Sequence, residues 1–414
     1  MNTINKKFVL TYLCLFFFFL YLLGCATSPA PITDKSGDAD FAQLLETIRQ
    51  KEKLPAIAAS VIIGGNIYVK AAVGTRKYGT NDWVTIEDKF LIGSCGKTFT
   101  ATLAAILIEK GFLEWDTTVQ DVFPELKMQP EWENITIQQL LSNRSGYVDD
   151  SSSHLLPSEE LTDLWDSNSS LKKIRLIYSE RAFNHKPIHP PDEVIVYANS
   201  GFLIAGSMLE KVTNKNFEIL MDEQLFQSLG LKSAGFGSPA ANESISEPQG
   251  HVKGVFFYVP VSQDLPDFIA PMGNVAISIG DWSKFVMFHL GNHQDTKNNL
   301  LGSGTIKKLH TPPNSAKWNY EAHKDADTNT LNYALGWFTE KRGDGNILIG
   351  HKGRGKSFTA VVHTDPRNKN AILLMTNAKV DHINLLRAAE AIKNYYPSQA
   401  NLPIVNMPTH SVWQ

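Results

Sequence analysis

A serine and a lysine three residues apart, in the run Ser94-Cys95-Gly96-Lys97, carry the most evident chemistry of this 414-residue chain. The pattern S-x-x-K opens an apolar stretch that predicts a helix, and residues i and i+3 of a helix lie on one face. A serine hydroxyl is a weak nucleophile until a neighbouring base takes its proton, and a lysine sheltered from water can share that task. Ser94 and Lys97 are therefore a candidate nucleophile and base, although a serine that caps a helix has the same pattern.

Two further short motifs carry groups that could complete such a site. Tyr197-Ala198-Asn199 places a phenol, which can relay a proton, on the same side of the chain as an amide, which can orient a substrate. A core tyrosine beside a turn asparagine is the structural alternative. His351-Lys352-Gly353 lies on a predicted strand, where alternation sends His351 and Gly353 to one face. Gly353 would let a substrate backbone approach closely.

The third motif overlaps a nucleotide-binding pattern. Gly350 to Ser357 reads GHKGRGKS and satisfies G-x-x-x-x-G-K-[ST]. A phosphate-binding loop needs a helix after the glycine turn, whereas the following residues, FTAVV, predict a strand. A second near match, Leu91 to Thr98, precedes a helix but has Leu91 where the first glycine belongs. Both runs are interpreted as parts of a different site, and no nucleotide partner is expected.

Composition excludes further classes of partner. The formal net charge is -3, the isoelectric point is about 6.5, and no long run of one sign occurs. A nucleic-acid partner is therefore not expected. Hydrophobic residues make up 43% of the chain, enough to bury one large core or two modest ones.

The N-terminus predicts export. Lys6 and Lys7 precede an uncharged apolar run from Phe8 to Leu23, which is typical of a signal peptide over residues 1–24. The end of the run, LLGC, resembles the lipobox of bacterial lipoproteins, which implies cleavage before Cys25 and a lipid on its thiol. An uncleaved membrane anchor is the alternative, but the run is shorter than the roughly 20 residues that span a bilayer. Ala26 after the cysteine resembles outer-membrane lipoproteins, so we expect a cell-envelope lipoprotein that faces the periplasm.

The order of elements predicts the domain organisation. Residues 25–40, rich in Pro, Ser and Thr, predict a flexible tether before one domain over residues 41–400. An amphipathic helix is expected from Phe41, a hairpin through Gly64-Gly65-Asn66, and a buried helix after Ser94 that stops at Gly111. Residues 115–250 are richest in helical patterns, Ser278 and Asp281 form a predicted capping box, and short β-rich runs and a last helix follow. The pattern predicts an α/β (α+β) sandwich, in which one sheet is assembled from both chain ends and a helical region is inserted.

The three motifs, in this order and separation, resemble the serine β-lactamase and penicillin-recognising peptidase superfamily. Segments such as ITIQQLLSNRSG, YALGWF and GHKGRGKSFTAVVHTDP are similar to its class C β-lactamase and D,D-carboxypeptidase/esterase branch, and the resemblance covers about residues 41 to 395. It implies a β-lactamase/transpeptidase-like fold, with an antiparallel sheet flanked by helices and an all-helical region beside it. The resemblance places the active site in the crevice between the sheet and the all-helical region.

The resemblance also implies a role for each motif residue. Ser94 would form an acyl-enzyme, Lys97 and Tyr197 would accept and return its proton, and His351 would support this proton network, with a charge that changes near neutral pH. Asn199 would orient the substrate amide, and no metal or cofactor is needed. The remaining substrate-binding positions would be Lys352, Gly353 and Arg354, the last through a backbone NH that completes an oxyanion hole with the NH of Ser94.

Departures from the branch bear on the substrate. Its β-lactamases usually have Lys-Thr-Gly at the third motif, whereas histidine in first place is more typical of its peptidases and esterases, and Lys352 replaces a hydroxyl that often contacts a substrate carboxylate. Asn143 and Arg144 replace a frequent His-Thr pair, in a loop interpreted as structural. Cys95 is interpreted as a small buried residue, because no Cys-His arrangement supports a thiol mechanism.

Three functions fit this pattern. The favoured one is an exported serine hydrolase that acts on an ester or on a D-amino-acid amide or peptide, related to peptidoglycan or a small molecule. The second is a class C-like β-lactamase, and the third is a non-catalytic protein that binds penicillin or peptidoglycan. The intact set of Ser94, Lys97, Tyr197 and His351 argues against the third.

Overall fold

The computed structural model describes residues 29–147, 170–240, 246–261, 266–291, 300–314, 316–318, 330–396 and 401–408. The predicted signal peptide and Cys25 lie outside these residues. In the part of the chain that is described, no helix combines the length and apolar character needed to span a bilayer.

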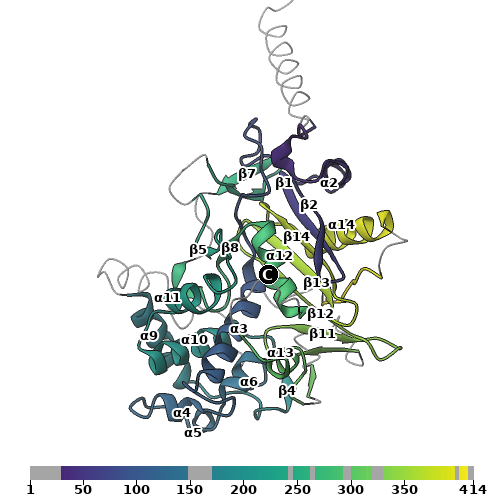
Figure 1. The fold of residues 1–414 in the computed structure, drawn as a ribbon. Helices are drawn as coiled ribbons and strands as arrows, with labels where there is room; N and C mark the ends of the chain where they lie inside the picture. The colour runs from purple at the N-terminus through teal and green to yellow at the C-terminus, as the bar shows by residue number, and fades with distance from the viewer. Residues whose placement is uncertain are drawn as a thin grey trace, which may run out of the picture.

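A seven-stranded antiparallel sheet forms the centre of the fold, with strand order β10-β11-β12-β13-β14-β1-β2 (Figure 1). The last strand of the chain pairs with the first, as in the contact of Ala59 with Leu374. This confirms the prediction of one sheet built from both chain ends. The strands are β1 (Ala56–Ile63), β2 (Asn66–Gly74), β10 (Leu331–Tyr333), β11 (Phe338–Lys341), β12 (Ile347–Arg354), β13 (Thr359–Asp365) and β14 (Asn370–Thr376).

A predicted hairpin turn and a predicted strand are confirmed, and the strand rejects the nucleotide-binding motif. Gly64 and Gly65 join β1 to β2 with φ values of +58° and +84°, the left-handed conformations of a tight hairpin turn. In the GHKGRGKS run, β12 is followed by a short turn and then by β13. Because no helix follows the glycines, backbone NH groups cannot converge on a phosphate as in a phosphate-binding loop.

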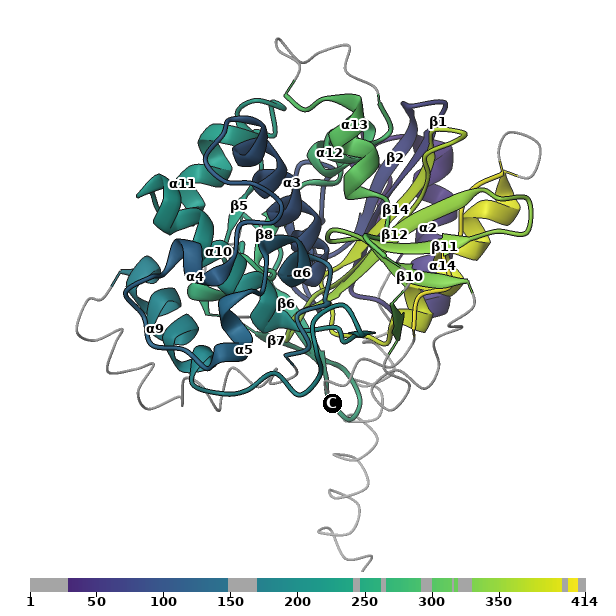
Figure 2. The same ribbon diagram turned by 90° about the horizontal axis from the view of Figure 1, so that it is seen from below.

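Helices cover both faces of the sheet (Figure 2). On one face α2 (Ala39–Glu52) and α14 (His382–Tyr395) pack on β1, β2, β13 and β14 around Phe41, Leu45, Leu374 and Leu385. On the other face lie α3 (Gly96–Glu109) and α12 (Ile279–His289), and beyond them the helical region. That region contains α4 (Val119–Val122), α5 (Pro130–Glu133), α6 (Ile137–Leu141), α9 (Leu171–Phe183), α10 (Asn199–Thr213) and α11 (Phe217–Met221), followed later in the chain by α13 (Ser303–Leu309). The six described helices from α4 to α11 lie within residues 115–250, the range in which the inserted helical region was predicted.

The remaining elements are short helical turns and strands outside the seven-stranded sheet. They are the 3-10 helices η1 (Asp34–Ser36), η2 (Gly93–Cys95) and η4 (Asp267–Ile269), the π-helical turn η3 (Asp222–Phe226), and the short strands β3 (Phe90–Leu91), β4 (Val194–Ile195), β5 (Gly235–Phe236), β6 (Gly250–Lys253), β7 (Tyr258–Val261), β8 (Val275–Ile277) and β9 (Lys317–Trp318). Strand β3 leads directly into η2, which carries Ser94.

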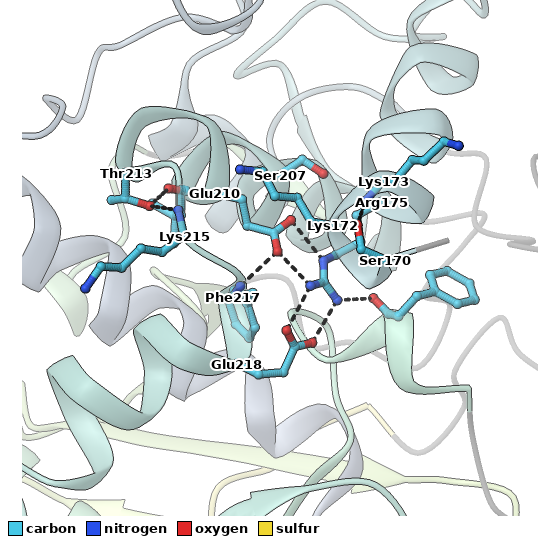
Figure 3. Close-up of polar contacts among 12 residues, drawn as sticks. Ser170, Lys172, Lys173, Arg175, Ser207, Glu210, Thr213, Lys215, Phe217 and Glu218 are labelled. Atoms are coloured by element: carbon cyan, nitrogen blue, oxygen red, sulfur yellow. Dashed lines mark hydrogen bonds and ion pairs between the residues drawn. The ribbon is translucent and has the colours of Figure 1, made fainter. Parts of the chain in front are cut away.

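A buried arginine ties the helical region together (Figure 3). Arg175 of α9 donates to both carboxylate oxygens of Glu210 on α10, at 3.1 and 2.7 Å, and to Glu218 on α11, at 2.9 and 3.0 Å. It also donates to the carbonyl oxygen of Phe268 in η4 at 3.1 Å. Burial lowers the pKa of Arg175, but the bonds and charges of the two glutamates outweigh this and raise the pKa overall. Four segments are therefore held by one guanidinium group.

Two predicted details need correction. The predicted tether over residues 25–40 ends early, because Ala30 is buried and its NH donates to Glu46 on α2 at 3.2 Å. Ser278 caps α12 by accepting the NH of Asp281, but the Asp281 carboxylate accepts from Ser233 at 2.7 Å and does not return to the Ser278 backbone. The tertiary contact to Ser233 therefore replaces half of the predicted capping box.

Acid should destabilise this fold through His251, which lies fully buried at the start of the β6–β7 hairpin. Its Nε2 accepts the NH of Tyr78 at 2.9 Å, and its Nδ1 donates to the Asn377 carbonyl at 2.7 Å, so this network needs the neutral ring. Burial lowers the pKa of His251 to about 4, so the unfolded chain binds the proton first. We expect the free energy of unfolding to fall by up to about 3 kcal/mol from this residue as the pH falls from 6.5 towards 4.

Urea titrations at several pH values measure this effect. His251→Gln keeps an acceptor and a donor, so it should show a shallower loss of stability with acid than the wild type. His185→Gln, at an exposed position, serves as the control and should keep the wild-type slope. Equal slopes for the wild type and His251→Gln would contradict the assignment.

Candidate active site

The candidate nucleophile lies on a tight turn between β3 and α3. Gly93 has φ of +52°, in the left-handed region, and the turn continues through Ser94 into the first residues of α3. The turn packs directly on β12, since a Cβ added to Gly353 would lie 1.8 Å from the carbonyl oxygen of Ile92 and 2.9 Å from the backbone nitrogen of Cys95. The third motif therefore positions the first one.

Lys97 is the centre of the polar contacts at this site. Its side chain is fully buried, and its Nζ lies 3.1 Å from Ser94 Oγ, 2.6 Å from Asn199 Oδ1 and 2.8 Å from the carbonyl oxygen of Met272. The same nitrogen also lies 5.0 Å from the centre of the Tyr197 ring. The structure thus brings together the predicted Ser94, Lys97, Tyr197 and Asn199 from two separate segments, about 100 residues apart in the chain.

The side chain of Asn199 bonds to Lys97, whereas its predicted role was to orient a substrate amide. Asn199 opens α10, and its side-chain oxygen accepts from the Nζ of Lys97 at 2.6 Å. Asn199 therefore holds the amine of Lys97 beside Ser94.

An aromatic wall fixes the Tyr197 ring. The ring stacks on Phe338 at 5.9 Å with an interplanar angle of 8°, and it meets the edge of Tyr333 at 5.9 Å. His351 lies next to it, with a distance of 6.1 Å between the ring centres. The position of the phenol is therefore set by β10, β11 and β12, which come from the far end of the chain.

His351 is buried and neutral. Its Nδ1 lies 2.8 Å from the carbonyl oxygen of Lys352, which can only accept, so Nδ1 carries the proton. Its Nε2 then accepts the hydroxyl of Tyr333 at 3.0 Å. Burial, followed by the positive charge of Lys97, holds the pKa of His351 well below its usual range. The prediction that its charge changes near neutral pH is therefore wrong.

Tyr333 is a site residue that the sequence analysis missed. Burial raises its pKa well above the usual value, so its hydroxyl keeps its proton and donates to His351. The residue opens the YALGWF run, which contributed to the family resemblance but was given no role. That run was the only available signal.

Lys352 lies on the other face of the sheet, so its predicted role in substrate binding is corrected. Neighbouring strand residues point to opposite faces, and His351 points to the site. The Lys352 ammonium group donates to the carbonyl oxygen of Pro408 in the C-terminal segment, and the side chain lines a small cavity with His363, His382 and Val405. The Lys352 side chain thus binds the C-terminal segment of the chain.

Gly353 also has a different task from the predicted one. The space that its missing side chain leaves is filled by the Ile92 carbonyl oxygen and not by a substrate. Arg354 follows on the same strand, and a Cβ added to Gly93 would lie 2.7 Å from its backbone nitrogen. The NH of Arg354 and the turn that carries Ser94 are therefore neighbours, as the predicted oxyanion hole requires.

Gly353→Ala should disturb the site, because an added methyl group would overlap the Ile92 carbonyl oxygen. A shift of about 1 Å in the nucleophile can cost on the order of 10²-fold in rate, and we expect kcat/KM to fall by about that factor. Steady-state hydrolysis of a p-nitrophenyl ester measures the loss. Gly304→Ala in α13, where the added Cβ meets nothing within 4 Å, is the control and should retain full activity. Full activity of Gly353→Ala would contradict the positioning role.

Comparison with known proteins places this arrangement in a family. The model of the family described as Beta-lactamase matches residues 41–395. The chain belongs to the beta-lactamase family. The match contains all the candidate residues named above, and members of this family and of the related penicillin-binding proteins are generally serine hydrolases.

Individual relatives of this beta-lactamase family member are distant. Penicillin-binding protein 4 of Amycolatopsis lactamdurans is 27% identical over 61% of this chain and 64% of its own length. Unguisins hydrolase ungD' of Aspergillus campestris is 25% identical over 61% of this chain and 48% of its own length. The matches thus span less than two thirds of these relatives. The fold is similar to that of the D-alanine carboxypeptidase AmpC from Burkholderia cenocepacia, with a TM-score of 0.66, 21% identity and coverage of 86% of this chain and 99% of that one.

The loop before β8 is a second part of the site that the sequence analysis missed in this beta-lactamase family member. The carbonyl oxygen of Met272 accepts from Lys97, and that of Pro271 accepts the hydroxyl of Thr100 on α3 at 2.6 Å. Gly273 packs against Gly93, since an added Cβ would lie 3.3 Å from the Gly93 carbonyl. The run Pro-Met-Gly-Asn signals a turn, but backbone acceptors leave no signature of their own in a sequence.

Asn143 and Arg144 have the predicted structural role. Asn143 Oδ1 accepts the NH of Ala198 at 3.0 Å, which positions the Y-x-N motif. Arg144 is fully buried and donates to the carbonyl oxygens of Ser142 and Tyr333, and burial lowers its pKa to about 10. The loop therefore connects Tyr197 with the strand that carries Tyr333.

Cys95 is the small buried residue that was expected. Its side chain is fully buried, and burial raises the pKa of the thiol, which opposes formation of a thiolate. Ser94 is thus the better nucleophile at this turn.

Proposed function

We propose that this chain is an exported serine hydrolase of the class C branch, which forms an acyl-enzyme on Ser94 and acts on an ester or on a D-amino-acid amide or peptide. The observation that carries the proposal is the 3.1 Å contact between Ser94 Oγ and the Nζ of a fully buried Lys97. A hydroxyl next to a positioned amine can lose its proton as it attacks a carbonyl carbon.

The reaction would proceed in two steps. Ser94 Oγ bonds to the substrate carbonyl carbon, and its proton passes to Lys97 or Tyr197 and from there to the leaving alcohol or amine. The backbone NH groups of Ser94 and Arg354 would stabilise the oxyanion. Water then attacks the acyl-enzyme, which releases the acid and returns the proton to Ser94.

Neutral His351 supports this reaction by position and not by charge. It fixes the Tyr333 hydroxyl and lies beside the Tyr197 ring. Because an added positive charge beside Lys97 is unfavourable, the low pKa of His351 keeps the site ready for proton transfer at neutral pH.

Ser94→Ala tests the proposal. We expect hydrolysis of a p-nitrophenyl ester, and acylation by a fluorescent penicillin or a D-alanyl amide, to fall by at least about 10³-fold, because no other group can form the acyl-enzyme. Cys95→Ala is the matched control at the neighbouring position and should retain activity.

Other outcomes of this experiment separate the alternatives. Fast nitrocefin hydrolysis would identify a class C-like β-lactamase, and stable labelling without turnover of any substrate would indicate a non-catalytic penicillin-binding protein. Absence of any Ser94-dependent acylation or hydrolysis over a broad substrate panel would end the enzyme proposal.

We also propose that the N-terminal segment attaches the enzyme to a membrane of the cell envelope, facing the periplasm and with the outer membrane as its destination. The support is the sequence pattern of residues 1–26, with an apolar run, a lipobox-like end and Cys25 as the lipidated residue. The mass of the purified protein, with a diacylglyceryl group on Cys25 or without one, tests this proposal.

A further inference from the structure

A hairpin tip exposes an unusual concentration of apolar side chains. Strands β6 and β7 are joined by a turn in which Val255 is 88% exposed, Phe256 81% and Phe257 54%, and Val259 on β7 is 41% exposed. The other large exposed apolar residues of the described chain, such as Ile188 and Ile219, are single residues that are not adjacent to one another in the sequence. Contiguous exposed apolar residues mark a surface that contacts another apolar phase or molecule.

This hairpin lies at the end of the molecule where the described chain begins (Figure 1). The loop between β2 and β3 contacts both the hairpin and η1 at the start of the described chain. At one side its Ile86 NH donates to the carbonyl oxygen of Lys35 in η1. At the other side Tyr78 donates to His251 of β6, and its ring lies 5.8 Å from that of Tyr258 on β7.

The packed domain starts close to the proposed attachment point. Ala30 is buried and bonded to α2, so the chain is held from this residue onwards. Even fully extended, the chain from Cys25 to Ala30 spans no more than about 18 Å. Whether the anchor is a lipid on Cys25 or the uncleaved apolar run before it, the end of the domain that carries η1 must stay near the bilayer surface.

We propose that the β6–β7 hairpin tip, residues 254–259, docks into the interface of the bilayer to which the N-terminus is attached. Phe256 and Phe257 would enter the boundary between headgroups and acyl chains, as apolar faces of interfacial proteins do. The exposed Lys253 directly precedes the tip, and the exposed Lys77 lies near His251 in the stem; both cations suit the phosphate of the headgroups.

Docking would orient the active site relative to the membrane. The hairpin stem packs on the turn between β12 and β13, because His251 NH donates to the carbonyl oxygen of Ser357 and a Cβ added to Gly250 would overlap the Ser357 side chain. Gly353 and Arg354, which border the Ser94 turn, are the last two residues of β12 and lead into the turn between β12 and β13. The contact would therefore hold the Ser94 site at a set height above the lipid surface.

The experiment uses the full chain in vesicles of phosphatidylethanolamine and phosphatidylglycerol. Phe256→Cys carries a polarity-sensitive fluorophore, and Ile347→Cys is the matched control, because it is a 40% exposed position at the opposite end of β12, about 23 Å from Arg354. Cys95 is buried, and the chain without an introduced cysteine gives the background labelling. Flotation first shows that each chain is attached to the vesicles.

We expect emission at position 256 to shift to shorter wavelengths and to be quenched at least about twofold by doxyl-labelled lipids, as for an interfacial side chain. Position 347 should show neither effect. The double variant Phe256→Ser/Phe257→Ser should hydrolyse a soluble p-nitrophenyl ester at the wild-type rate, because neither residue belongs to the Ser94 site.

Three results would overturn the proposal. Attached chains without quenching at position 256 would exclude docking and leave the N-terminal attachment intact. A spectral shift without lipid quenching would assign the tip to a protein contact, such as a second copy of this chain. Failure to float would reject the attachment and the docking together, and none of these results depends on the hydrolase activity.

Discussion

Replacing Lys97 with methionine is expected to lower kcat/KM for a p-nitrophenyl ester by at least about 10³-fold, in the range of a lost general base. Lys97 Nζ is 3.1 Å from Ser94 Oγ, and in the described residues it is the basic side-chain group for which a contact with that hydroxyl is seen. Methionine fills a similar volume among Tyr197 and Phe202, so the loss would reflect the amine and not a cavity. Steady-state kinetics and the rate of acylation by a fluorescent penicillin measure the effect.

Lys352→Met is the matched control for this prediction. Lys352 is also a buried lysine, but its ammonium group bonds to Pro408 on the other face of the sheet. We expect its KM and kcat to stay close to the wild-type values, in contrast to the role predicted from sequence. A Lys97→Met enzyme within tenfold of the wild type would remove Lys97 from proton transfer, and a large rise in KM for Lys352→Met would restore it to the substrate site.

Arg175→Met is expected to have the largest effect on stability, a loss of about 3–5 kcal/mol in the free energy of unfolding. Stability falls because Glu210, which is 1% exposed, would remain buried without its counter-charge. The variant also loses the bond to Phe268, just before the loop whose Met272 carbonyl binds Lys97. Activity should therefore fall before global unfolding as urea is added.

Urea unfolding followed by circular dichroism measures the loss. Lys211→Met provides the comparison, because Lys211 follows Glu210 on α10 and pairs with Glu125 at the surface. A solvent-exposed pair contributes little, so the unfolding midpoint of this control should not change measurably. The double variant Arg175→Met/Glu210→Gln should recover part of the loss, because it removes the unpaired buried charge. An Arg175→Met variant as stable as Lys211→Met would contradict the stabilising role of Arg175.

Local patterns predicted most of the fold, because they act over short stretches of chain. The glycines at 64 and 65 determine the hairpin turn, the apolar stripe after Ser94 determines α3, and the β-rich runs near the end determine β12 to β14. The same reasoning rejected the nucleotide-binding motif, since FTAVV is strand sequence and forms β13. The assembly of one sheet from both chain ends was also anticipated from the positions of the β-rich runs, whereas the order of its strands was not.

The sequence by itself determined which residues could react. Ser94, Lys97, Tyr197 and Asn199 were identified by type and spacing, and the structure brings them together. It did not determine the surroundings of each group, because burial and partners come from segments far apart in the chain.

Only the tertiary structure decided the tasks of the third motif. Burial beside Lys97 makes His351 a neutral acceptor for Tyr333, and packing of β12 on the Ser94 turn uses the space at Gly353. The partner of Lys352 is the carbonyl oxygen of Pro408, in a C-terminal segment that no local pattern connects with this strand. The physical reason is the same in each case: pKa values, close approaches and the choice of partner depend on what packs against a residue, and a single sequence does not contain that information in local form.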